Sequence, residues 1–171
     1  MNIFVSFVNK ITSILEKFLI SLMWIMVLAV IWQVITRFIF NSPSIFTDEL
    51  SRYLMIWLGI LGGAYISAKK KHLAIEWINS KLSPQNTIIL DVIINLIIII
   101  FTSIVFIYGG TIVVEKTLSF HQISPGLSLY GHHLPMGYVY LVAPISGVLI
   151  VIYSINDILF DLNKTINNKS E

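Results

Sequence analysis

The stretch DELSR places two acids and an arginine at the start of an apolar segment. Arg52 lies three residues after Glu49 and four after Asp48, so on a helix it can pair with either acid. With Thr47 as the N-cap, both acids fall in the first turn, where negative charge is favourable. Three interpretations stay open: a self-neutralised helix end, a fixed polar contact to another helix or subunit, and a proton or ion relay. The relay is disfavoured because the cluster lies at the rim of the apolar segment.

Histidines offer little further chemistry. His72, His121, His132 and His133 all lie between apolar segments, whereas a membrane haem needs two histidines inside facing helices. No cysteine is present, and no nucleophile elbow, phosphate loop or catalytic carboxylate pair is visible. We therefore expect no cofactor, no bound metal and no enzymatic activity. A membrane anchor subunit of a redox enzyme stays open as an alternative and would require a haem or quinone site.

The composition indicates an integral membrane protein. Of 171 residues, 56% are hydrophobic and only 12% are charged, with a mean hydropathy of +0.85, whereas soluble domains are about 25% charged. The net charge of +2 and the absence of a basic stripe argue against a nucleic-acid partner. The expected fold class is an all-α integral membrane protein.

Four apolar spans of helical length are predicted, at about 18–40, 45–68, 88–114 and 135–160, in one membrane domain covering 1–171. Residues 3–18 have helical spacing and either lie on the membrane surface or lengthen the first span. The segment HLAIEWINSKL predicts a short interfacial helix, and Ser83-Pro84 suits the start of the third span. Segment 118–134 is expected to be irregular, and Pro144 to kink the fourth span.

The distribution of lysine and arginine predicts the orientation. Eight of the eleven lie in the N-terminal flank, the loop after the second span and the C-terminal tail. The other three are Arg37, Arg52 and Lys116, on the opposite side. The positive-inside rule then places both termini in the cytoplasm.

Small and polar residues suggest where helices pack. Gly59, Gly63 and Ser67 recur every four positions, a spacing that lets a second helix come close. That helix belongs either to this chain or to a partner. Arg37 is expected to snorkel to the membrane interface. All acids lie near span ends or in loops, so a stand-alone transporter, which needs polar groups converging at the midplane, is disfavoured.

The motifs together resemble the DctQ-like family, the small membrane subunit of tripartite ATP-independent periplasmic (TRAP) transporters. The resemblance covers about residues 33–147, and DELSR through H-x-x-x-E is its most specific part. The motif LSLYGHH is longer than the family pattern. The matching residues are Arg37, Phe38, Phe46, Asp48, Glu49, Leu50, Ser51, Arg52, Trp57, Gly63, Ala64, Lys69–Lys71, His72, Leu73, Ile75, Glu76, Ser124, Pro125, Leu127, Pro135, Met136, Tyr140, Pro144 and Gly147.

This resemblance implies a scaffold function. Such a subunit pairs with a large sodium-coupled membrane subunit, and a periplasmic substrate-binding protein delivers an organic acid such as a dicarboxylate, sialic acid or sugar acid. The expected location is the bacterial inner membrane, in contact with phospholipid. The residues expected at subunit or lipid interfaces are Arg37, Asp48, Glu49, Arg52, Trp57, Gly59, Gly63, His72 and Glu76.

Overall fold

A computed structural model of the chain describes residues 2–69, 84–129 and 132–167. Its elements are α1 (Asn2–Phe38), α2 (Ile45–Ala68), α4 (Pro84–Thr102), the π-helical segment η1 (Ser103–Gly109), α5 (Gly110–Ser119), β1 (Ile123–Leu129), β2 (His132–Pro135), α6 (Met136–Tyr140) and α7 (Val142–Asn167). Four helical stretches are long and apolar enough to cross a membrane: Phe4–Phe38, Ile45–Ala68, Asn86–Ser119 and Met136–Asn163. The prediction of an all-α membrane protein with four spans is confirmed.

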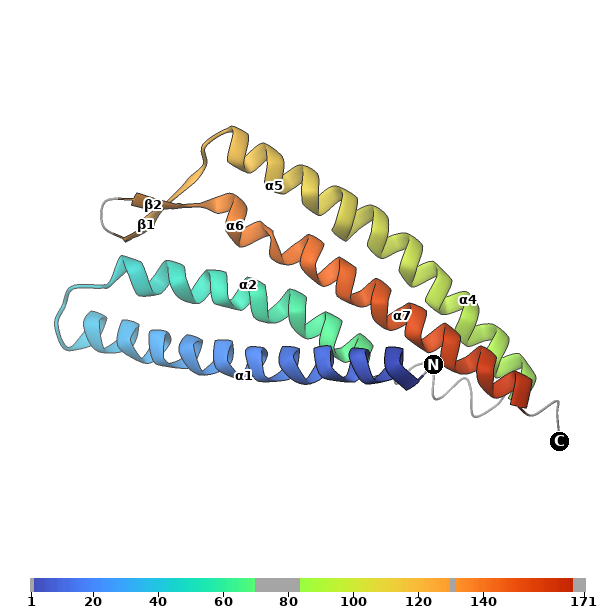
Figure 1. Ribbon diagram of the computed structural model, residues 1–171. Coiled ribbons are helices and arrows are strands. Elements are labelled where there is room, and N and C mark those ends of the chain that lie inside the picture. The colour runs from blue at the N-terminus through green and yellow to red at the C-terminus, as the bar shows by residue number, and fades with distance from the viewer. Residues whose placement is uncertain (1, 70–83, 130–131, 168–171) are drawn as a thin grey trace.

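The spans form a row. α1 packs against α2, α2 against α7, and α7 against α4 and η1 (Figure 1). α1 begins and α7 ends at one end of the row, named here the terminal end, while β1 and β2 lie at the opposite hairpin end. A row leaves broad apolar faces uncovered: Trp24, Leu28 and Ile97 are 62%, 61% and 60% exposed. These faces require lipid or another protein to cover them.

The first helix is continuous from Asn2, so the amphipathic segment before the predicted first span lengthens that span. Its buried side chains recur every seven residues, a spacing that keeps one seam of a helix on a neighbouring helix. The positions at this spacing are Val8, Leu15, Leu22, Ala29 and Thr36, and Thr12 is buried as well. Val8 and Leu15 of this seam belong to the same buried cluster as Leu61 and Ala64 of α2.

The second helix begins at the predicted residue, but its cap differs from the prediction. The N-cap is Ser44, not Thr47, because the Ser44 hydroxyl accepts the Thr47 amide at 3.4 Å. Thr47 donates its own hydroxyl to the Ser44 carbonyl at 3.3 Å. Asp48 remains in the first turn, next to the positive end of the helix dipole, whereas Glu49 lies just beyond it.

The expected kink in the fourth span is a break between α6 and α7 at Leu141. Pro144 has no amide hydrogen, so the carbonyl of Tyr140, four residues earlier, loses its helical donor, and the ring crowds the preceding turn. The interruption therefore lies within one turn before the proline, as its chemistry requires.

Two adjacent small residues let α7 approach both neighbours. The Ser146 hydroxyl donates to the Ile60 carbonyl of α2 at 3.0 Å. On the other side, a Cβ added at Gly147 would lie 2.9 Å from side-chain atoms of Phe106 and Ile107 in η1. The core between the spans is correspondingly tight, with Val142 fully buried.

The prediction of an irregular segment was wrong for residues 123–129 and 132–135, because β1 and β2 pair as antiparallel strands. Ser128 faces His133, Leu129 faces His132, and the register is irregular between Ile123 and Ser128. The pairing of β1 with β2 supplies hydrogen-bond partners to the backbone of β1, which packs against α2. A positive φ of 50° at His121 makes the turn from α5 into this hairpin.

Candidate functional site at the hairpin end

Asp48 connects the first two spans. One of its carboxylate oxygens accepts from Arg52 at 2.6 Å, and the other accepts from the Gln33 amide of α1 at 2.6 Å. Spacing allowed Arg52 to pair with either Asp48 or Glu49. In the structure it pairs with Asp48, four residues before it. The side chains of this ion pair are 69% and 36% exposed, which limits its stabilising effect to about 0–1 kcal/mol.

Glu49 holds the hairpin. Its Oε2 atom accepts the Ser124 hydroxyl, the Leu127 amide at 3.2 Å and, more weakly, the Tyr53 hydroxyl at 3.4 Å. Ser124 is fully buried. One side chain of α2 therefore receives donors from a turn more than 70 residues away in the sequence.

The turn above Glu49 needs a glycine. A Cβ at Gly126 would lie 2.6 Å from the side chain of Ile45 and 2.9 Å from the carboxyl carbon of Glu49. In β2, the Nδ1 atom of His133 lies 3.2 Å from the carbonyl oxygen of Ser124. The first turn of α2 and the hairpin thus form one packed unit.

Trp57 holds the fourth span about two helical turns along α2 from Glu49. Its indole N–H donates to the Val139 carbonyl at 3.1 Å, two residues before the break at Leu141. The same ring meets Phe18 of α1 edge to face, with centroids 6.3 Å apart. Trp57 therefore joins α1, α2 and α6.

The glycine face of α2 is open among the residues that the structure describes. Nothing lies within 4 Å of a Cβ added at Gly59, Gly62 or Gly63. In the described ranges, no helix therefore packs closely against Gly59 or Gly63. Arg37 is exposed in the last turn of α1, and the remaining predicted site residues, His72 and Glu76, lie outside the described residues.

This arrangement is suited to holding elements together. Both oxygens of Asp48 accept a hydrogen bond, and Glu49 Oε2 accepts three, so both carboxylates are engaged in contacts within the fold. In the part of the chain that the structure describes, no three histidine or acidic side chains gather closely enough to hold a metal ion. The site therefore joins three spans and a hairpin through hydrogen bonds.

Sequence reasoning missed the partners of both acids. It gave no role to Gln33 toward Asp48, and it did not connect Glu49 with the hairpin. The signal was present in the motif S-P-x-L, whose Ser124 and Leu127 both donate to Glu49. Two separate motifs of the resemblance therefore meet in space.

The fold and site define a class: a four-span membrane subunit whose polar groups fix its own spans and hairpin. Residues 26–163 match the family model described as "Tripartite ATP-independent periplasmic transporters, DctQ component". This chain belongs to that family and is a TRAP transporter small permease subunit.

Curated relatives agree with this assignment. A TRAP transporter small permease protein of Haemophilus influenzae is 32% identical over 144 residues, covering 84% of this chain and 83% of its own length. The sialic acid TRAP transporter small permease protein SiaQ of Vibrio cholerae is 28% identical over 139 residues, covering 77% of each chain. The sialic acid TRAP transporter permease protein SiaT of H. influenzae is 30% identical over 80 residues, which are 46% of this chain and 12% of SiaT.

Proposed function

We propose that this small permease scaffolds a large, sodium-coupled membrane subunit that takes up an organic acid delivered by a periplasmic binding protein. The substrate class is a dicarboxylate, sialic acid or sugar acid. Family membership supports a role in a tripartite transporter, and the match to part of the much longer SiaT permease supports a large permease as partner.

The observation that carries the scaffold function is an uncharged central belt. Residues 18–36, 53–68, 92–114 and 134–156 contain no aspartate, glutamate, lysine, arginine or histidine. Secondary transporters bind substrate and coupling ions near the midplane, at broken helices lined by polar groups. The break at Leu141 lies within this belt, and residues 134–156 around it carry no charged side chain or histidine. Substrate and sodium therefore pass through another chain, and this chain has no catalytic role.

The open glycine face is the proposed contact with the large subunit. Gly59 and Gly63 are exposed on α2, and the space over them admits the backbone of a second helix. The apolar faces of the row that the large subunit does not cover contact phospholipid.

The hairpin end is proposed to face the periplasm. This orientation follows from the excess of lysine at the other end and puts both termini in the cytoplasm, with the spans in the bacterial inner membrane. Because Glu49 fixes the hairpin on α2, the hairpin presents a stable surface on the side from which the binding protein approaches. Asp48, Arg52 and Arg37 lie at the same end.

Copurification tests the contact. A tagged chain carrying Gly63→Leu should recover less of the large permease than the wild type does, while its own melting temperature stays unchanged because the site is open. Ser21→Leu, which adds the same bulk at an exposed small residue of α1, is the matched control and should leave recovery unchanged. Normal recovery with Gly63→Leu would refute the contact.

A further inference from the structure

A polar cavity lies at the terminal end, between the start of α1, the end of α2 and the last part of α7. Its volume is about 410 Å³, within the range of about 300–1,000 Å³ typical of small-molecule sites. Lys69, Asn9, Asn156 and Asp157 contribute polar groups to its walls, and Tyr153 also lines it. None of these residues takes part in the contacts at the hairpin end.

Tyr153 has an unused hydroxyl at this cavity. The side chain is 1% exposed, and its oxygen has no hydrogen-bond partner. Thr12 lies beside it, and the Thr12 hydroxyl donates to the Val8 carbonyl at 2.9 Å. Buried polar groups nearly always have a partner, and Tyr153 is one of the residues that line this cavity.

The walls carry one charge of each sign. The Lys69 ammonium lies 3.7 Å from the Glu16 carboxylate, in a pair whose side chains are 42% and 45% exposed. This exposed ion pair is weak, so the Lys69 ammonium can also donate to another acceptor. Asp157 has an interaction of its own, but a carboxylate offers about four acceptor positions. A ligand with both an anionic and a cationic group matches these walls better than a purely anionic one.

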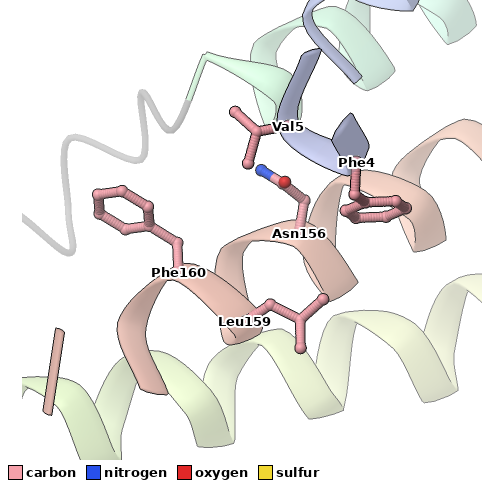
Figure 2. Close-up of a pocket in the computed structure, with 5 residues that line it drawn as sticks. All are labelled: Phe4, Val5, Asn156, Leu159 and Phe160. Atoms are coloured by element: carbon pink, nitrogen blue, oxygen red, sulfur yellow. The ribbon is translucent and has the colours of Figure 1, made fainter. Parts of the chain in front are cut away.

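An apolar groove adjoins the polar cavity. It has a volume of about 380 Å³ and is lined by Phe4, Val5, Asn156, Leu159 and Phe160. Three of these residues also line the polar cavity. Figure 2 shows the Asn156 amide pointing toward Val5, with Phe4 and Phe160 to either side. The polar and apolar parts therefore form one amphipathic site at the depth where span ends meet lipid headgroups.

We propose that this site binds a zwitterionic phospholipid with a primary ammonium, such as phosphatidylethanolamine. The ammonium donates to Asp157, and the phosphate accepts from Lys69 and the Asn9 amide. The Tyr153 hydroxyl donates to a phosphate or ester oxygen, and an acyl chain follows the apolar groove past Leu159. The site is independent of the proposed contact with the large subunit.

Native mass spectrometry of the delipidated full chain tests the proposal, with phosphatidylethanolamine and phosphatidylglycerol of identical acyl chains as probes. We expect one phosphatidylethanolamine to bind in clear preference. Tyr153→Phe removes one hydrogen bond and should weaken that binding about three- to tenfold. Asp157→Asn should abolish the preference over phosphatidylglycerol. Glu115→Gln, at the hairpin end, is the control and should change neither.

Two results would overturn the proposal. Equal binding of the two lipids by the wild type would show that the walls do not select an ammonium group. Unchanged binding in both Tyr153→Phe and Asp157→Asn, with unaltered melting temperatures, would show that any retained lipid lies elsewhere on the apolar faces.

Discussion

Replacing Glu49 by alanine should release the hairpin from the second span. The substitution removes the acceptor of the Ser124 hydroxyl and of the Leu127 amide, although that amide keeps the Ser124 oxygen at 3.2 Å. A hydrogen bond to a charged group contributes about 1.5–3 kcal/mol. Two are lost, and solvent entering the gap recovers part of the energy. The free energy of opening the hairpin should therefore fall by about 2–4 kcal/mol.

Hydrogen exchange measured by mass spectrometry reads this change directly. Amides of residues 123–129 should exchange about 30- to 1,000-fold faster in Glu49→Ala, since each 1.4 kcal/mol is a factor of ten. Glu49→Gln keeps the shape and one acceptor oxygen, so its effect should be smaller. Glu115→Ala removes an exposed glutamate of α5 and should leave exchange unchanged.

The reasoning fails if exchange in 123–129 is the same in Glu49→Ala and the wild type. It fails equally if Glu115→Ala accelerates exchange as much, because the effect would then be one of net charge at the hairpin end and not of the specific donors.

Further substitutions test other contacts. Arg52→Ala should change the free energy of unfolding by no more than about 1 kcal/mol, because the ion pair is exposed and Gln33 still donates to Asp48; a larger loss in denaturant titration would contradict this. Gly147→Ala should lower the free energy of unfolding by about 1–3 kcal/mol, because the added Cβ overpacks against η1. Gly63→Ala should be neutral or stabilising, because its site is open and alanine favours helix. Equal melting temperatures of the two variants would refute this difference. Cysteines placed singly at Ser128 and Ser170 should react with an impermeant thiol reagent from opposite sides of the membrane, and labelling from one side would refute the orientation.

Local patterns were sufficient for the spans. The apolar run with its flanking charges gave 45–68 for the second helix, as the structure has it. The extension of the first helix was left open because one periodicity serves both a surface helix and a longer span. Its seven-residue seam depends on α2 being present as a neighbour.

Contacts between distant segments were not predictable in the same way. The hairpin gains stability from Glu49, 75 residues before Ser124, and nothing in residues 118–134 alone specifies that acceptor. The choice of Asp48 by Arg52 and the donation from Gln33 depend on how α1 and α2 cross. The four-residue spacing of the glycines fits packing within the chain and packing on a partner equally well. The spacing therefore could not predict that the glycine face is open.

Uptake by reconstituted liposomes tests the scaffold function most directly. Liposomes with a sodium gradient should accumulate the organic acid when this chain, the large permease and the binding protein are all present, and not when any one of them is omitted. The uncharged central belt predicts no sodium-driven uptake by this chain alone. Accumulation of an organic acid by this chain in the absence of the large permease would contradict the account.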